Sequence, residues 1–219
     1  MKLRKQDWTV SQIHQNEATP FIEKWHYAHG TANTSVICFG LFYKGDTKTL
    51  HGASWWMPPV IGAAKWANPE HQRVLALSRF CLVEGRPDNS GSFLISGGIK
   101  MLDRKKYSTL LTYADTALNH KGTIYQASNW TYRGLSGKNA MWWDKENNKM
   151  ISCKRGAKTF NRQEMLDQGH EFLGKFSKHR FVYPLSRRGI VITPIEKQLE
   201  LEFNNKGNII DNNKGEKPN

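Results

Sequence analysis

The 219 residues can form one domain with a substantial core, and 38% of them are hydrophobic. Lys and Arg number 32 against 19 Asp and Glu, which gives a net charge of +13 and favours an anionic partner, nucleic acid before an anionic membrane. The longest strongly apolar stretch, about residues 36–42, is too short to span a membrane, and the N-terminal residues contain no hydrophobic signal segment. We therefore expect a soluble, intracellular protein with no membrane partner.

Cysteine and tryptophan contents indicate a reduced core with many aromatic anchors. Cys38, Cys81 and Cys153 are odd in number and widely spaced, and no CxxC pair is present, which argues against a structural zinc site and favours buried free thiols. Eight tryptophans are unusual for one chain. Each could anchor the core or stack on a base, and we expect most of them in the core.

The N-terminal part predicts a helix followed by three strands. Thr19 and Pro20 are typical of a helix cap and first turn, and the helix should end near residues 29–30. Apolar residues 35–43 and 47–56, separated by turn residues 44–46, predict an antiparallel hairpin. Residues 74–83 predict a third strand, which ends at a Gly-Arg-Pro turn.

The central part continues as helix, strand and helix. Asp88, Asn89 or Ser90 can cap a helix whose apolar residues recur at helical spacing up to residue 102. Residues 109–113 predict a central strand with Asp115 at its C-terminal end, and a short helix is expected near residues 124–129.

The remainder is more basic and less regular. We expect strands at residues 150–153 and 180–183 and a helix near 161–167; residues 190–196 fit either a helix start or a strand end. Residues 204–219 are Asn, Lys and Gly with almost no apolar content, which predicts a disordered tail. The expected organisation is thus a single domain over residues 1–203 and a polar tail.

A first candidate site is the strand, turn and helix start around residues 82–94. Free backbone N–H groups and the positive end of a helix dipole suit a pyrophosphate, although many such turns bind nothing. No GxGxxG motif follows a strand, and the Gly134 to Asn139 segment lacks the spacing of a P-loop.

A second candidate is the His26-Tyr27-Ala28-His29 segment. Two imidazoles three residues apart could bind a metal, and a single one could act as a general base. The alternative is a pair of surface or capping histidines. The absence of HExxH disfavours metalloprotease chemistry.

A third candidate joins Asp115 to Tyr125, Gln126, Asn129 and Trp130. The carboxylate could accept a proton, the phenol could donate one, and the Asn amide could pair with an adenine edge while Trp130 stacks on an extruded base. In the alternative interpretation, Asp115 caps the next helix and Tyr125 packs in the core. Basic clusters at 104–106, 154–158 and 187–188 are solvated faces by default, but the net charge suggests that at least one follows a phosphate backbone.

Five segments in this order resemble the motifs of the Mom DNA-modification proteins of bacteriophages. They are Trp25-His26-Tyr27-Ala28-His29, Leu77-Ser78-Arg79, Asn89-Ser90-Gly91-Ser92-Phe93-Leu94, Tyr113-Ala114-Asp115 and Gly122 to Trp130. The resemblance covers about residues 20–135. It implies an α/β (α+β) fold like that of GNAT acyltransferases: a central mixed, mostly antiparallel sheet, flanked by helices and splayed at the acyl-CoA site.

The resemblance also implies an activity and a set of site residues. The activity is conversion of adenine in double-stranded DNA to an N6-methylcarbamoyl (acetamido-type) form, which protects phage DNA from host restriction enzymes in the host cytoplasm. Acetyl-CoA is the implied acyl source, and iron is a further implied requirement. The implied residues are His26, Tyr27, Asp115 and Tyr125 for catalysis, Arg79, Asn89, Ser90, Gly91 and Ser92 for the cofactor, Asn129, Trp130 and Arg133 for the substrate, and His26 with His29 for a metal.

One departure separates this chain from typical GNAT enzymes. They carry a Gln/Arg-x-x-Gly-x-Gly/Ala loop, whereas here the segment from Arg86 to Gly91 takes its place. Two other functions are compatible with the sequence. A GNAT-type acetyltransferase acting on a protein or small molecule would not need the charge of +13, and a non-catalytic DNA-binding protein would not bind CoA.

Overall fold

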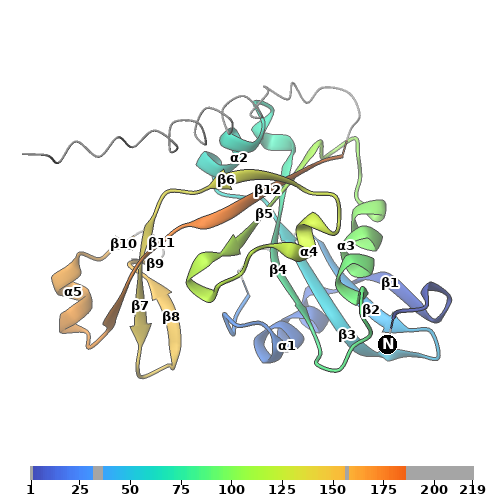
Figure 1. Cartoon of the computed structure of the whole chain (residues 1–219), viewed down its shortest axis with the longest axis horizontal. Helices are drawn as coiled ribbons and strands as arrows, with labels where there is room; N and C mark the ends of the chain where they lie inside the picture. Colours follow the sequence, from blue (N-terminus) through green and yellow to red (C-terminus); the bar gives the residue numbers. More distant parts are fainter. Residues whose placement is uncertain (1, 32–36, 156–157, 186–219) are drawn as a thin grey trace, which may run out of the picture. The chain divides into compact units, whose positions relative to one another are not determined.

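A seven-stranded sheet is the main layer of the protein in a computed structural model (Figure 1). The structure describes residues 2–31, 37–155 and 158–185. The strands follow the order β1 (Trp8–Ile13), β2 (Ile37–Tyr43), β3 (Asp46–Met57), β4 (Val74–Leu82), β5 (Thr109–Asp115), β12 (Lys178–Pro184) and β6 (Thr131–Leu135). Neighbouring strands are antiparallel except for β4 and β5, which are parallel.

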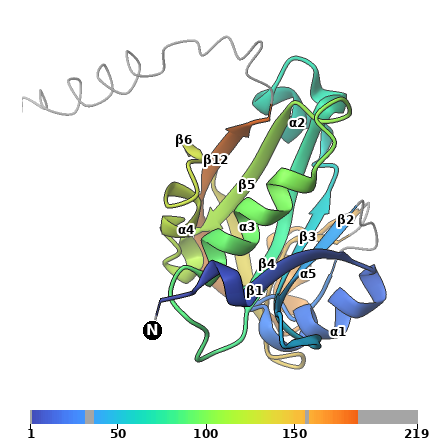
Figure 2. The same cartoon turned by 90° about the vertical axis from the view of Figure 1, so that its right-hand side faces the viewer.

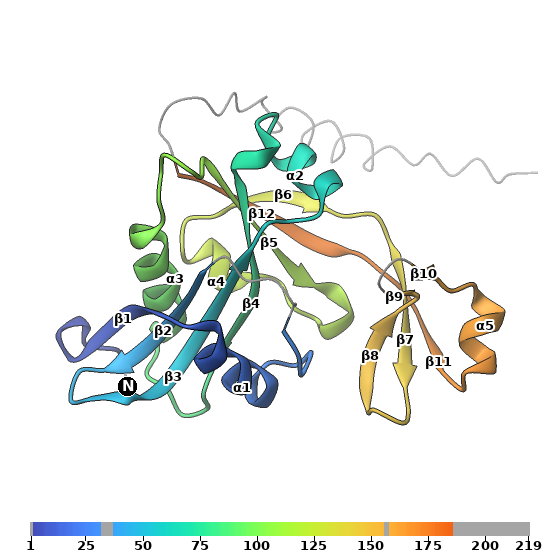
Figure 3. The ribbon, with the colours of Figure 1, turned by 180° about the vertical axis from the view of Figure 1, so that it is seen from behind.

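Helices cover both faces of this sheet, because its strands carry apolar side chains on both sides (Figures 2 and 3). On one face, α3 (Ser90–Met101) and α4 (Thr123–Gln126) pack on the largest hydrophobic cluster. On the other face, α1 (Gln15–Trp25) and α2 (Ile61–Ala67) each pack on a smaller cluster. Short 3-10 helices complete the layer at Lys5–Asp7, His71–Arg73 and Thr116–Leu118.

An insertion between β6 and β12 forms a second, three-stranded sheet, which we call the insertion (residues 139–176). Its strands follow the order β11 (Glu171–Phe176), β7 (Asn139–Asp144) and β8 (Lys149–Ser152). It also contains the short β9 (Lys154–Arg155), β10 (Lys158–Thr159) and α5 (Arg162–Asp167). Trp142 and Met165 are buried, and no residue of the insertion belongs to the three hydrophobic clusters described above.

The expected fold class is confirmed, and so are most of the expected elements. The hairpin β2–β3, strands β4 and β5, and helix α3 form where the sequence predicts them. The expected strands at 150–153 and 180–183 correspond to β8 and β12, and the helix at 161–167 corresponds to α5. Cys38 and Cys81 are buried as expected, whereas Cys153 is only partly buried.

The sequence prediction places the start of the first helix at the wrong residue. Helix α1 begins at Gln15, four residues before Thr19, and Pro20 lies inside it. The predicted end is wrong too: the helix ends at Trp25, and the extended backbone of His26 terminates it before residues 29–30. The His14 side chain accepts the Asn16 backbone N–H, and Glu17 reaches back to the His14 N–H, so this pair caps the helix. Strands β1, β6, β7 and β11 and helix α2 were not predicted. The tail and residues 190–196 lie outside the described residues.

Candidate active site

The parallel strands β4 and β5 separate halfway along their length. Their pairing runs from Val74 opposite Thr109 to Leu77 opposite Thr112 and goes no further. The register between β3 and β4 shifts at the same level, so that Ser78 forms a bulge. The Thr112 hydroxyl donates to the Leu77 carbonyl at 3.0 Å and closes the last paired step. The expected splay of the sheet is therefore present.

A cavity of about 440 Å³ opens at this splay. Its lining includes His26, Tyr27, Ser78, Tyr113, His120 and Tyr125. Tyr125 and Ile124 come from α4 on one face of the sheet, whereas His26 and Tyr27 follow α1 on the other. The cavity thus connects the two faces between the separated strands.

His26 is the most perturbed histidine at the cavity. It is the C-cap of α1 and is 5% exposed. Burial, together with the positive charge of Arg79, lowers the pKa of His26 to about 4, so the imidazole is neutral at pH 7. Nδ1 accepts the Ala28 backbone N–H at 3.1 Å, which assigns the remaining proton to Nε2. The neutral ring therefore has a donor, rather than a base, available for the cavity.

One phenol, that of Tyr27, lies beside this imidazole, and that of Tyr125 lines the same cavity. The ring of Tyr27 lies 4.2 Å from the His26 ring, centroid to centroid, and Tyr27 is 47% exposed. Burial raises the pKa of Tyr27 and also that of Tyr125, whose hydroxyl is hydrogen-bonded to Thr112. Both phenols are protonated at neutral pH and can donate a proton.

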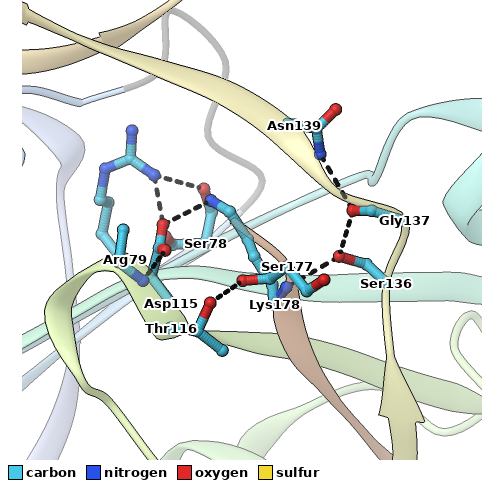
Figure 4. Close-up of polar contacts among 10 residues, drawn as sticks. Ser78, Arg79, Asp115, Thr116, Ser136, Gly137, Asn139, Ser177 and Lys178 are labelled. Carbon is cyan, nitrogen blue, oxygen red and sulfur yellow. Dashed lines mark hydrogen bonds and ion pairs between the residues drawn. The ribbon is translucent and has the colours of Figure 1, made fainter. Parts of the chain in front are cut away.

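Asp115 is buried and already has two partners. Its Oδ1 accepts the Ala117 backbone N–H at 3.0 Å, and its Oδ2 lies 3.0 Å from Lys178 Nζ. Figure 4 shows this ion pair next to Ser78 and Arg79. Asp115 is not one of the residues that line the cavity. It caps the turn that carries His120, which agrees with the capping alternative, and its catalytic role stays a prediction.

Arg79 lies on the α1 side of β4, away from the turn that follows the strand. Its Nε donates to the Gly30 carbonyl at 2.9 Å, and its Nη1 donates to Ser78. These bonds fix the segment after His26 against the sheet. The geometry thus gives Arg79 a structural role at the cavity, and it offers no support for the expected contact with a cofactor phosphate.

The start of α3 retains features of a phosphate site. Asn89, the N-cap of α3, has a left-handed backbone (φ 69°). Its side chain makes no hydrogen bond to the first N–H groups of the helix. Ser90 and Ser92 donate their hydroxyls to the backbone carbonyls of Pro87 and Asn89. A Cβ at Gly91 would lie 2.7 Å from the end of the Ile124 side chain, so a larger residue would force that side chain to move. The cofactor role of Asn89, Ser90, Gly91 and Ser92 stays a prediction.

The expected substrate residues do not converge on the cavity. Trp130 is 4% exposed and packs against Trp56, Tyr125 and Tyr183, so its ring is a core anchor and not a surface on which a base could stack. Asn129 is exposed beside it. Arg133 lies on β6, outside the cavity lining.

The expected iron site does not fit the histidines. Nδ1 of His26 is occupied by a backbone N–H, and Nδ1 of the exposed His29 lies 3.0 Å from the Glu23 carbonyl. Within residues 2–31, 37–155 and 158–185, no group of three His, Cys, Asp or Glu side chains could hold a metal ion. The iron requirement is therefore not supported.

Sequence reasoning missed Lys178, Tyr113 and His120. Lys178 faces Asp115 only because β12 pairs with β5. This pairing joins residues more than sixty positions apart in the sequence, so no local pattern indicates it. His120 could have been found, since it follows the strand end that carries Asp115.

Residues 7–199 match the Mom protein family. The chain belongs to this family. No curated protein matches the sequence.

Three solved structures that resemble this Mom-family chain are acetyltransferases. The ribosomal-protein-S18-alanine N-acetyltransferase from Escherichia coli superposes with a TM-score of 0.50 at 11% identity, over 84% of this chain and 98% of that one. An N-acetyltransferase from Staphylococcus aureus gives 0.49 at 12% identity, over 82% and 99%. A GNAT acetyltransferase from Elizabethkingia anophelis with acetyl-CoA bound gives 0.48 at 11% identity, over 82% and 99%. The likeness to the Escherichia coli structure shows that the Mom-family chain has the acetyltransferase fold.

Among the helices that the structure describes, none is both long and apolar enough to cross a membrane.

Proposed function

We propose that this Mom-family protein is a DNA modification enzyme that uses acetyl-CoA to convert adenine in duplex DNA to N6-methylcarbamoyl (acetamido-type) adenine. In a phage-infected cell, the product would protect phage DNA from restriction endonucleases. The observation that carries the proposal is the cavity at the β4–β5 splay, because it opens to both faces of the sheet and is lined by a neutral imidazole and three protonated phenols.

The two faces would receive different molecules. The start of α3 offers uncapped N–H groups on the face that α3 and α4 cover, and this face suits the pyrophosphate of CoA. On the opposite face the cavity is bounded by His26, Tyr27 and Tyr113. A base extruded from duplex DNA could enter there and meet the thioester between the separated strands.

The side chains at the cavity would then polarise the acyl group and supply protons. His26 Nε2–H can donate to the thioester carbonyl oxygen as negative charge develops on it. Tyr27 or Tyr125 can protonate the departing thiolate of CoA. Acetyl-CoA would supply the carbon atoms. The acetamido product contains one N–H unit more than an acetyl group, so the reaction requires, besides acetyl-CoA, an amine-type nitrogen donor and a two-electron oxidant that accepts the two hydrogens released.

Mass spectrometry of nucleosides from plasmid DNA tests the proposal in cells that express the wild type, His26→Asn or His71→Asn. In His26→Asn the amide oxygen of the new side chain replaces Nδ1 as acceptor for the Ala28 N–H, whereas nothing replaces the Nε2–H donor. His71 lies outside the cavity lining and serves as the matched control. We expect deoxyadenosine heavier by an acetamido group in the wild type and the control, and about 10²- to 10⁴-fold less in His26→Asn.

Unmodified deoxyadenosine in cells with soluble, folded wild type would contradict the proposal. An acetyltransferase acting on a protein or small molecule would then become the better account.

A further inference from the structure

Two arginines lie side by side on the sheet face that α1 and α2 cover. Arg180 on β12 is paired with Tyr113 on β5, and directly paired residues of antiparallel strands point to the same face. Arg133 lies on β6 where the register with β12 shifts. A Cβ at Gly134 would lie 3.9 Å from Arg180 Nη2, so the Arg180 side chain reaches across to β6, beside Arg133.

An aromatic platform fixes one of these arginines. The guanidinium carbon of Arg180 lies 3.9 Å from the ring centroid of Trp66 on α2. A stacked guanidinium keeps its plane and directs its N–H groups sideways, which preorganises it for an oxyanion. Tyr113 lies in the same cluster as Trp66 and also lines the cavity. The arginine pair is therefore next to the wall of the cavity.

Both guanidinium groups have N–H donors without an acceptor, and neither has an anionic partner among the described residues. Nε of Arg133 and Nε of Arg180 are both buried without a hydrogen-bond partner. In the parts of the chain that the structure describes, neither guanidinium makes an ion pair with a carboxylate. Two neighbouring, partly desolvated cations repel each other, and buried donors without partners cost free energy. A bound oxyanion would remove both costs.

A phosphate is the oxyanion that suits a pair of guanidinium groups, since each can bind it through two parallel N–H bonds. The pyrophosphate of CoA fits the start of α3, which lies on the opposite face of the sheet. The phosphate at the arginine pair therefore belongs to the other substrate.

We propose that Arg133 and Arg180 bind one backbone phosphate of duplex DNA next to the adenine that enters the cavity. This inference rests on the proposed function and deepens it, because it names the residues that hold the DNA backbone. Trp66 holds the Arg180 plane, and Tyr113 links the phosphate site to the cavity.

The test measures binding of the full chain to a fluorescent DNA duplex across a range of salt concentrations, for the wild type and Arg133→Gln/Arg180→Gln. Loss of one phosphate contact lowers the slope of log affinity against log salt by about one and weakens binding about tenfold near 0.1 M salt. Lys100→Gln removes an exposed charge from α3 on the opposite face and should change little. Arg180→Lys keeps the positive charge but loses the planar guanidinium group with its paired N–H donors. This variant should bind duplex DNA more weakly while the protein stays folded.

Binding of acetyl-CoA to the same variants separates the two sources of phosphate. We expect it to be unchanged. Weaker acetyl-CoA binding with unchanged duplex binding would assign the pair to the cofactor and overturn the inference. Unchanged binding of both ligands would show that Arg180 only packs on Trp66, and it would also overturn the inference. The proposed function would remain intact in that case. Failure of the wild type itself to bind duplex would count against the proposed function as well.

Discussion

At the scale of single residues, His26 shows how burial at the end of a helix alters a side chain. The same imidazole on the surface would titrate near pH 6.5. Here burial and Arg79 hold its pKa at about 4. The Ala28 N–H then selects the tautomer that carries its proton on Nε2. The sequence identifies such a histidine as a candidate general base. The structure indicates instead that its neutral ring donates a hydrogen bond from Nε2.

The depressed pKa of His26 predicts a loss of stability in acid. As the pH falls below 6.5, the unfolded chain binds a proton at His26 before the folded chain does, so the free energy of unfolding falls until the pH reaches about 4. Between about pH 7 and about pH 5 the loss amounts to about 2 kcal/mol. Urea unfolding of the wild type and His26→Asn checks this. The difference in stability between the two should shift by that amount in favour of the variant as the pH falls.

A stability difference that stays constant over this pH range would show that His26 titrates normally. The neutral donor assigned to it would then be wrong.

At the scale of elements, local patterns predicted those parts whose signal lies within a few residues. The hairpin β2–β3 has apolar runs and a turn, and α3 has apolar residues at helical spacing behind a polar turn. In the insertion, β8 and α5 were predicted, whereas β7 and β11 were missed because they are short and the core beneath them rests on few residues, such as Trp142. The start of α1 was misplaced because histidine is an uncommon cap.

The residues of the candidate site also fall into those that local sequence predicts and those that depend on tertiary contacts. His26, Tyr27 and Tyr125 were predicted and do line one cavity. The partner of Asp115, Lys178, depends on the pairing of β5 with β12, which no local pattern specifies. Trp130 was offered as a stacking surface, and only its tertiary neighbours show that it belongs to the core.

The uncapped start of α3 leads to a prediction with opposite effects on stability and binding. In Asn89→Asp a negative charge at the positive end of the helix dipole should stabilise the free protein by about 0.3–1 kcal/mol. The same charge should repel a pyrophosphate. Acetyl-CoA at about a hundred times its Kd should raise the Tm of the wild type by roughly 5 to 10 °C, and most of this rise should be lost in the variant.

Asn148→Asp supplies the control, because Asn148 also has a positive φ but lies in the turn between β7 and β8. An equal rise in Tm with acetyl-CoA for Asn89→Asp and the wild type would show that the cofactor does not bind at this helix start.

At the scale of the whole molecule, the sheet separates two kinds of chemistry. Helices α3 and α4 cover the face that suits a nucleotide cofactor, and the opposite face carries the Arg133–Arg180 pair beside the cavity. The net charge of +13 favours association with a polyanion. The splay between β4 and β5 is the place where the two substrates could meet.

The most direct test of the account follows the acyl carbons into DNA. Purified protein would be added to an extract of cells that lack it, together with duplex DNA and excess acetyl-CoA carrying heavy carbon in both acetyl positions; the extract supplies the nitrogen donor and the oxidant. We expect a modified deoxyadenosine that carries the heavy carbon with the wild type and almost none with His26→Asn. Modified deoxyadenosine without the heavy carbon would contradict acetyl-CoA as the source, and unmodified deoxyadenosine would contradict DNA as the substrate.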